Sequence, residues 1–309
     1  MKSKSSANIS VVCLMGPTAS GKTELAINLS KEFPIDIISV DSAQVYRGMD
    51  IGTAKPSKEV LKQYPHHLID ICDPEQSYSA GDFVKDAAQQ INDTKNRNRI
   101  PLLVGGTMLY FHSLVNGIAD LPKGDFEVRK LIENEAEIIG WSKMHQKLKK
   151  IDPEAAGKIN ANDKQRIQRA LEVFELSGRK ISELRNEKVT NKAFSFIKFA
   201  VNTQDREELH TRINKRFLKM LDNGFIEEIK LLRKRKNLTI GHSSMRAVGY
   251  RQIWGYLDGK CSYEEAVKKA QASTRQLAKR QITWLRGMED IISINACSKN
   301  IVTAINSIS

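Results

Sequence analysis

A phosphate-binding loop stands near the start of the chain. Residues 16–23, with the sequence GPTASGKT, match the pattern G-x-x-x-x-G-K-[ST] in full. In this pattern the glycines allow a tight backbone path whose N–H groups face phosphate oxygens, the lysine adds a positive charge, and the last hydroxyl can ligate Mg²⁺. We therefore expect a diphosphate or triphosphate in this loop, with Mg²⁺ on Thr23. The residues of the loop are Gly16, Pro17, Thr18, Ala19, Ser20, Gly21, Lys22 and Thr23.

Two polar residues follow other apolar runs of the sequence. Asp41 comes directly after residues 35–40, and Thr107 follows the glycine pair at 105–106. If both runs are parallel strands, their carboxyl ends meet beside the phosphate loop. Asp41 could ligate Mg²⁺ or act as a general base, but an aspartate before a serine also caps loops. Thr107 could donate to a phosphate oxygen, or the glycines could simply make a tight turn.

An arginine pair lies further along the chain. Arg212 and Arg216 stand at an i, i+4 spacing in a stretch with helical periodicity, so they share one face of the expected helix. Two guanidinium groups on one face could bind an anion, although such a pair more often lies on a solvated surface. The spacing alone leaves both interpretations open.

Five short apolar runs must position these residues. They are nearly continuous rather than alternating, which is typical of parallel strands covered on both faces. Helix-like stretches separate them, including residues 23–31 after the phosphate loop and 80–95 after Ser79, a predicted N-cap. The alternation predicts an α/β fold with a parallel sheet like that of P-loop NTPases, flanked by helices. The expected strands are residues 10–15, 35–40, 67–71, 100–104 and 194–201.

No strand pattern interrupts the long segment between the fourth and fifth runs. This segment is charged, has helical periodicity and is broken by glycines and by Asp-Pro and Asn-Asp pairs. We expect a helical insertion domain at residues 120–193, within a catalytic core formed by residues 1–119 and 194–309. Further helical stretches are expected in the core at residues 206–232 and 263–286, whereas the tail after them has no strong pattern.

The composition favours a polyanionic partner. The 309 residues carry a formal net charge of +13, with a pI near 9.5, which favours nucleic acid ahead of a membrane surface. The apolar run before the phosphate loop is too short for a secretory signal, and no segment is long enough to cross a membrane. The cysteines at positions 13, 72, 261 and 297 lack the spacing of metal ligands and are expected to be reduced. These features predict a cytoplasmic protein.

Six segments resemble the tRNA dimethylallyltransferase family, also called tRNA isopentenyltransferases. The most specific are ISVDSAQVYRGMDIGTAKP at 38–56 and TRQLAKRQITWLRG at 274–287. The resemblance runs from about residue 11 to residue 288 in the family's order, and the missing C-terminal zinc finger of many eukaryotic relatives points to the bacterial form. The other segments are MGPTASGKTELA at 15–26, RIPLLVGGTMLYF at 99–111, NDKQRIQRALEVFELSG at 162–178 and RAVGYRQIWGYL at 246–257.

The resemblance implies a prenyl transfer to RNA. The dimethylallyl group of dimethylallyl diphosphate would pass to N6 of adenosine 37 in tRNAs that read codons beginning with U, giving N6-dimethylallyladenosine and diphosphate. The helical insertion would contact an anticodon stem-loop that carries adenines at positions 36–38. Mg²⁺ is the implied cofactor, and we expect a monomer that needs no membrane.

The resemblance also assigns roles to single residues. Asp41 is the implied general base, although it could orient N6 without taking the proton. Thr107 and Arg216 would bind the departing diphosphate together with the phosphate loop. The residues expected to contact tRNA are Asp41, Ser42, Ala43, Gln44, Thr107, Arg129, Gln165, Arg166, Ile167, Gln168, Arg169, Arg246, Ala247, Val248, Gly249, Tyr250 and Arg251.

Two other functions fit parts of the sequence. A P-loop kinase or nucleotide hydrolase of a small acceptor would share the phosphate loop, but no apolar run that ends in aspartate stands in an obvious Walker B position, unless Asp41 serves. A non-catalytic RNA-binding module would explain the positive charge but not Asp41 and Thr107 beside a metal-binding loop. Turnover of ATP without tRNA would identify the kinase.

Overall fold

An all-parallel sheet carries the larger of two structural units. The computed structural model describes residues 9–187, 193–202, 205–295 and 299–307. The contacts within the chain divide it into a core unit, residues 1–113 and 192–309, and an inserted unit, residues 114–191. These boundaries differ by only a few residues from those expected from the sequence. Each unit is described by itself.

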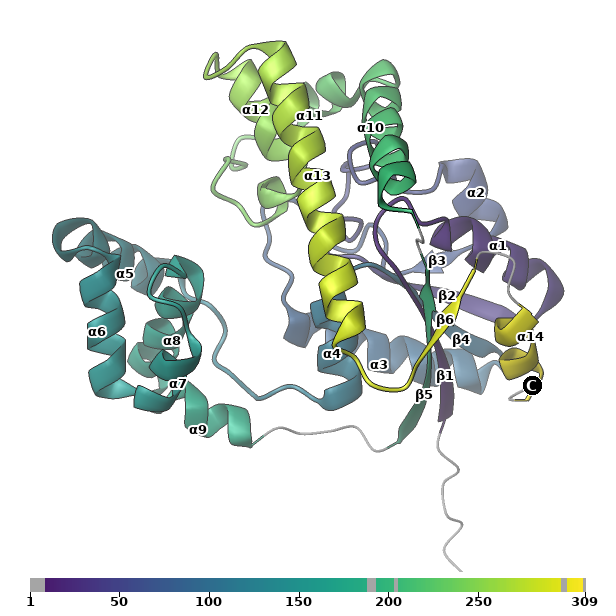
Figure 1. Ribbon diagram of the computed structural model, residues 1–309, viewed down its shortest axis with the longest axis horizontal. Helices are drawn as coiled ribbons and strands as arrows, with labels where there is room; N and C mark the ends of the chain where they lie inside the picture. Colours follow the sequence, from purple (N-terminus) through teal and green to yellow (C-terminus); the bar gives the residue numbers. More distant parts are fainter. Residues whose placement is uncertain (1–8, 188–192, 203–204, 296–298, 308–309) are drawn as a thin grey trace, which may run out of the picture. The chain divides into compact units, whose positions relative to one another are not determined.

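The sheet of the core unit has six strands in the order β3-β2-β4-β1-β5-β6 (Figure 1). Every neighbouring pair is parallel. This arrangement confirms the predicted α/β class, and it explains the apolar runs, because both faces of a parallel sheet are covered. The strands are β1 (Ile9–Met15), β2 (Ile35–Val40), β3 (His66–His67), β4 (Ile100–Gly105), β5 (Phe194–Val201) and β6 (Ile291–Ile294).

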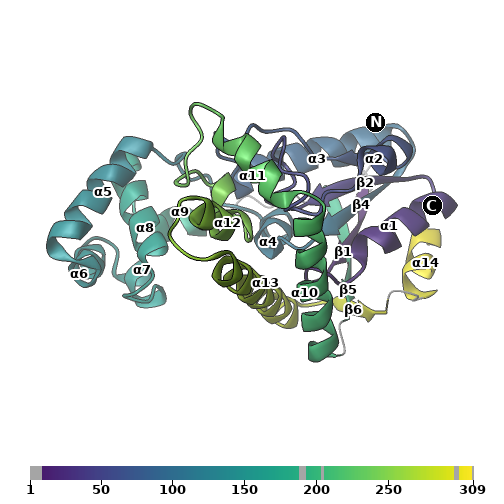
Figure 2. The same ribbon diagram turned by 90° about the horizontal axis from the view of Figure 1, so that it is seen from above.

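Helices cover the sheet and close its crossovers. Helices α1 and α14 lie side by side in Figures 1 and 2, and their Leu25, Leu29, Ile301 and Ile305 pack with sheet residues in one hydrophobic cluster. The helices with residues in the core unit are α1 (Lys22–Glu32), α2 (Lys58–Gln63), α3 (Ala80–Asn96), α4 (Met108–Asn116), α10 (Arg206–Asp222), α11 (Phe225–Arg233), the 3-10 turn η1 (Ser244–Arg246), α12 (Tyr250–Leu257), α13 (Tyr263–Arg286) and α14 (Lys299–Asn306).

A second cluster joins the helices that follow β5. Phe217 of α10, Phe225 of α11 and Tyr250 of α12 are nearly or fully buried, and their rings meet edge to face. The cluster also takes in Ala266 and Ala270 of α13. Because small residues of α13 meet this cluster, the long helix packs closely against the shorter ones, and α10 and α13 lie side by side in both ribbon views.

The inserted unit is helical. Its core consists of apolar side chains from all five of its helices, with Ile167 and Val173 of α8 fully buried. A buried aspartate, Asp152, caps α7 by accepting from Ala155 N at 2.9 Å and also accepts from Ser182 N at 3.0 Å. The helices are α5 (Phe126–Ile139), α6 (Trp141–Ile151), α7 (Pro153–Lys158), α8 (Lys164–Ser177) and α9 (Ile181–Asn186).

Three sequence expectations are corrected by the structure. The third strand spans only His66–His67, because Leu68 and Asp70 adopt positive φ values of 62° and 55° that leave the extended region. A sixth strand, β6, was not expected, since four residues are too few to show a periodic pattern. The stretch at 206–232 is two helices, separated where Gly224 takes a φ of 93°.

Two further expectations concern the reduced state of the cysteines and the length of the apolar segments. Cys13, Cys72 and Cys261 are free thiols, while Cys297 lies outside the described residues. Within the same part of the chain, no helix is both long and apolar enough to cross a bilayer.

The register of the sheet brings three chain segments to one level. Met15 of β1 and Val40 of β2 are both paired with Gly105 of β4. The residues that follow the strands, including Gly16 and Asp41, therefore leave the sheet side by side. Gly105 is required at this level because a Cβ there would lie 2.0 Å from the carbonyl oxygen of Val40.

A pair of glycine substitutions tests this close approach. Gly105→Ala should lower the free energy of unfolding by about 3 kcal/mol, because the new methyl group forces β2 and β4 apart. Gly255→Ala in α12 is the matched control, since a Cβ there meets no atom within 4 Å, and it should stabilise by roughly 0.5 to 1 kcal/mol. Urea unfolding of both variants measures the difference. Equal stabilities would show that the approach of Val40 to Gly105 is not a constraint.

Candidate active site

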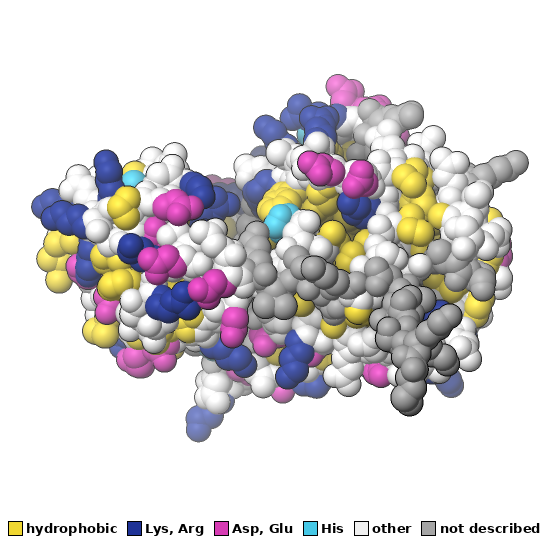
Figure 3. Space-filling model, turned by 90° about the horizontal axis from the view of Figure 1, so that it is seen from below, with side chains coloured by type: hydrophobic (Ala, Val, Ile, Leu, Met, Phe, Trp, Pro, Cys, Tyr) yellow, Lys and Arg dark blue, Asp and Glu magenta, His cyan; other side chains and the backbone are white. Residues whose placement is uncertain are grey.

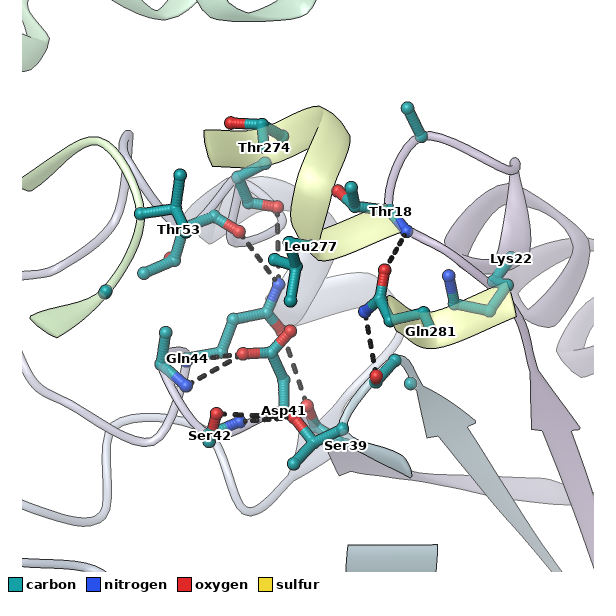
Figure 4. A pocket seen from close by; sticks show the side chains of 18 of the residues that line it. Thr18, Lys22, Ser39, Asp41, Ser42, Gln44, Thr53, Thr274, Leu277 and Gln281 are labelled. Carbon is teal, nitrogen blue, oxygen red and sulfur yellow. Dashed lines mark hydrogen bonds between the residues drawn. The ribbon is translucent and has the colours of Figure 1, made fainter. Parts of the chain in front are cut away.

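A cavity of about 850 Å³ opens at the carboxyl edge of the sheet (Figure 4). Its walls come from the phosphate loop, from the segments after β2 and β4, and from α10 and α13. All of these elements belong to the core unit. The predicted site residues that line it are Thr18, Ala19, Ser20, Gly21, Lys22, Thr23, Asp41, Ser42, Ala43, Gln44, Thr107, Arg216, Arg246, Ala247 and Val248.

The phosphate loop has the geometry that its sequence predicts. Gly21 has a φ of 87° and precedes the first residue of α1. The first N–H groups of a helix have no intrahelical acceptor and together form an anion site. A Cβ on Gly16 would lie 2.9 Å from Ser20 Oγ, so a larger residue there would displace side chains of the loop.

Lys22 is folded back onto the loop. Its Nζ donates to Pro17 O at 2.6 Å and to Ser20 Oγ at 3.2 Å. The pKa of Lys22 is lowered to about 7, mainly by burial and also by the neighbouring Arg216, while Asp41 partly opposes both effects. The ammonium group thus lies where positive charge is costly, and an arriving anion would offset that cost.

Of the expected pair Arg212 and Arg216 on α10, Arg216 lines the cavity and Arg212 does not. Burial lowers the pKa of its guanidinium, and Asp41 opposes that shift. Arg212 lies one turn earlier and comes within 3.7 Å of Glu208 on the same helix. Arg216 therefore belongs to the cavity and Arg212 does not, a distinction that their i, i+4 spacing could not make.

Asp41 is both a loop-capping and a cavity-lining residue. Its Oδ1 accepts from Ala43 N at 2.8 Å and from Gln44 N at 3.2 Å, which is the capping role that sequence allowed. Thr107 ties the segment after β4 to the same turn, because its Oγ1 accepts from Ser42 N at 3.0 Å. Asp41 and Thr107 therefore meet at one edge of the sheet, as the sequence predicts.

Gln44 supports the cavity wall with its side chain. Its Nε2 donates to Thr53 O at 3.3 Å and its Oε1 lies 3.3 Å from Ser39 Oγ. The wall segment is held from the other side by Glu228 of α11, which accepts from the amides of Asp50, Ile51 and Gly52 and from Tyr250 Oη. Sequence reasoning missed Glu228, since its partners lie far away in the chain.

One face of α13 also lines the cavity, although none of its residues was among those expected at the site. Five of its residues line the cavity: Thr274, Leu277, Arg280, Gln281 and Trp284. Four of them recur at the i, i+3, i+7 and i+10 positions of a single helical stripe. This stripe lies within the segment that resembles the tRNA dimethylallyltransferases, so a search for helical spacing inside that segment would have found it.

Two residues of the expected tRNA-binding set belong to the hydrophobic core. Tyr250 and Ile167 have no exposed surface, and Tyr250 donates to Glu228 Oε1 at 2.5 Å. A continuous range on a helix always includes inward-facing positions. Their side chains are therefore structural, while Arg251 and Arg246 are exposed and Gly249, with a φ of 94°, makes the turn into α12.

In the inserted unit, two of the expected arginines pair with one glutamate. Glu172 is fully buried and accepts from Arg129 Nε at 2.8 Å and from Arg169 Nη1 at 2.6 Å. Both hydrogen bonds lower the pKa of Glu172, although its burial opposes them. Arg129 and Arg169 therefore stabilise the fold of this unit, whereas Gln165 and Arg166 are exposed.

Gln168 and the surface charges also bear on the expected tRNA contacts of the inserted unit. Gln168 Nε2 donates to Arg129 O at 3.2 Å and to Glu133 Oε1 at 2.9 Å. On the face drawn in Figure 3, the Lys and Arg side chains over α5–α9 are interspersed with Asp and Glu. This face therefore carries mixed charge and not a uniform basic patch.

Two oxygen donors fit a magnesium ion. Mg²⁺ usually binds one or two protein oxygens together with substrate phosphates and waters. The hydroxyl of Thr23 and the carboxylate of Asp41 line the same cavity. Among the described residues, no group of three or more His, Cys, Asp or Glu side chains is placed to hold a metal. The donor set therefore suits an ion that is bound jointly with a diphosphate.

Comparison with known proteins places this chain in a family. Residues 44–288 match the family model described as IPP transferase. The chain is 52% identical over 296 residues to a tRNA dimethylallyltransferase of Coxiella burnetii, covering 96% of this chain and 95% of that protein. It is 53% identical over 290 residues to a tRNA dimethylallyltransferase of Nitrosococcus oceani, covering 94% of this chain and 92% of that protein.

Solved structures show the same fold. The tRNA isopentenylpyrophosphate transferase of Bacillus halodurans matches with a TM-score of 0.68 at 37% identity, covering 97% of this chain and 95% of that one. A eukaryotic dimethylallyltransferase described as acting on tRNA matches with a TM-score of 0.77 at 28% identity. That match covers 97% of this chain and 77% of the eukaryotic one.

The separation of Arg212 from Arg216 predicts different effects on anion binding. Arg216→Ala should weaken the binding of inorganic diphosphate by about 10- to 100-fold, because a charge-assisted contact to the anion is lost. Arg212→Ala changes the same residue type on the same helix and should leave this affinity near the wild-type value. Isothermal titration in the presence of Mg²⁺ measures both. Equal losses in the two variants would contradict the assignment of Arg216 to the anion site.

Proposed function

Because the chain belongs to the IPP transferase family and is a tRNA dimethylallyltransferase, we propose that dimethylallyl diphosphate is its prenyl donor and that N6 of adenosine 37 is its acceptor. The tRNAs would be those that read codons beginning with U and carry adenines at positions 36–38. One observation carries the proposal: the phosphate loop and Asp41 line a single cavity. A leaving group and an acceptor can therefore meet there.

The diphosphate would be the leaving group of the reaction. The allylic C–O bond breaks, its electron pair goes to the diphosphate, and negative charge grows on that group. Interactions that strengthen as this charge grows lower the barrier. The amides at the start of α1 and the side chains of Lys22, Thr107 and Arg216 are the groups assigned to this task. Mg²⁺ on Thr23, when bound, would add further positive charge to the leaving diphosphate.

The acceptor would react next to Asp41. A new C–N bond forms from N6 of adenine, and one N6 proton must then leave. This nitrogen becomes acidic as it gains positive charge, so a carboxylate of ordinary basicity is sufficient to accept the proton. In this proposal Asp41 takes the proton, while its bonds to the amides of Ala43 and Gln44 fix the orientation of the carboxylate.

The adenine must leave the stack of the anticodon loop to reach the cavity. Enzymes that modify a base commonly extrude it, at a cost of a few kcal/mol. Exposed Arg246 lies at the cavity wall and is suited to bind the RNA backbone. Exposed Gln165 and Arg166 of the inserted unit are proposed to contact the anticodon stem-loop. The enzyme would work as a monomer, since one chain supplies every residue assigned here.

The direct test is mass spectrometry of tRNA after reaction. Unmodified tRNA with adenines at positions 36–38 is incubated with the protein, Mg²⁺ and dimethylallyl diphosphate, then digested to nucleosides. N6-dimethylallyladenosine should appear, and it should be absent when adenosine 37 is replaced by guanosine. Turnover of ATP without tRNA, combined with unmodified nucleosides, would contradict the proposal.

The role of Asp41 is tested by a substitution that keeps its loop intact. Asp41→Asn retains an oxygen to accept from the amides of Ala43 and Gln44 but loses the basic carboxylate. The rate of transfer should fall by about 10²- to 10⁴-fold, while the affinity for tRNA stays near wild type. Single-turnover kinetics and filter binding give the two values. Full transfer activity in this variant would remove Asp41 from the proton transfer.

A further inference from the structure

A buried glutamine joins α13 to the phosphate loop. Gln281 Oε1 accepts from Thr18 N at 2.9 Å, and Gln281 Nε2 donates to Gly106 O at 2.8 Å. Figure 4 shows the amide of Gln281 between the phosphate loop and the segment after β4. One side chain thus connects three elements that line the cavity.

The burial of Gln281 and the glycine at position 106 both shape this contact. Gln281 is only 8% exposed, so an amide left without partners there would cost about 1 to 3 kcal/mol. A Cβ at position 106 would lie 2.4 Å from Gln281 Nε2, so a larger residue there would displace the amide of Gln281. Both partners of Gln281 are backbone groups, which cannot rotate away as side chains can.

The loop residue next to this contact is strained. Ala19 has a φ of 62°, in the left-handed region that costs a non-glycine residue about 1 to 2 kcal/mol. It packs against the cluster of Leu209, Ile213 and Ala278, together with Ile282. Helix α13 therefore holds the strained turn in two ways, through the cluster that contains Ala278 and through the hydrogen bond from Thr18 N to Gln281.

The hydrogen bond from Thr18 N to Gln281 also determines which amides of the loop remain available to an anion. Since Gln281 accepts the Thr18 N–H, this group is not offered to a diphosphate. The N–H groups at the start of α1 have no intrahelical acceptor and remain available for the anion. Gln281 thus has no need to touch the diphosphate in order to influence it.

We propose that Gln281 is a positioning residue, which holds the phosphate loop in the conformation that binds the leaving diphosphate. It acts through the backbone of Thr18 and Gly106, so its loss would loosen the strained turn at Ala19. The inference rests on the proposed function for the identity of the anion. It predicts that α13 controls affinity for the diphosphate donor separately from affinity for tRNA.

Gln281→Met tests the proposal without leaving a cavity, since methionine fills a similar volume but makes neither hydrogen bond. The KM for dimethylallyl diphosphate and the dissociation constant of inorganic diphosphate should both rise by about 10- to 100-fold. The dissociation constant of tRNA should stay near wild type. Gln276→Ala, at an exposed position of the same helix, is the control and should change none of these values.

A second variant approaches the same contact from the opposite side. Gly106→Ala places a methyl group against Gln281 Nε2 and should reproduce the selective loss of diphosphate affinity. Melting temperatures establish that each variant is folded. Wild-type diphosphate affinity in a folded Gln281→Met protein would overturn the proposal, as would a parallel loss of tRNA affinity. If the wild-type protein binds diphosphate but transfers no prenyl group, the proposed function fails, while the diphosphate titration still decides the role of Gln281.

Discussion

The site depends on two cations held close together at the carboxyl edge of a parallel sheet. Burial lowers the pKa of both Lys22 and Arg216, and Arg216 lowers the pKa of Lys22 further. Asp41 offsets part of this cost, but one carboxylate faces two positive groups. In the proposed reaction, a diphosphate would supply the missing negative charge, and it would supply more as its bond to carbon breaks. The same electrostatic arrangement can therefore bind the donor and favour its departure.

The sheet and α13 keep this arrangement rigid. The register at Met15, Val40 and Gly105 fixes where the three cavity segments leave the sheet. Helix α13 then lines the cavity with five residues, four of them on one stripe, and reaches the loop through Gln281. Catalysis requires the reacting groups to be placed accurately. Here that placement depends on backbone contacts between strands and helices. The inserted unit has its own core and its own buried ion-pair centre at Glu172.

Much of this could be predicted from local patterns, and the rest depends on distant partners. The N-cap at Ser79 and the span of α13 follow from neighbours in sequence and match the structure. The phosphate loop is equally local. Gln281 is different, because its partner Thr18 lies 263 residues away in the chain. The burial of Tyr250 could likewise not be predicted. A family resemblance assigns a role to a whole segment, whereas packing decides which of its side chains face inward.

In the proposed reaction, the phosphate loop retains the diphosphate while the carbon chain departs. Dimethylallyl diphosphate that carries ¹⁸O in the bridge between carbon 1 and phosphorus tests which bond is cleaved. The account predicts that all of the ¹⁸O appears in the released diphosphate, since the C–O bond breaks and nitrogen takes the carbon. Recovery of the ¹⁸O in dimethylallyl alcohol would mean that the P–O bond breaks, and it would contradict the proposed cleavage of the C–O bond.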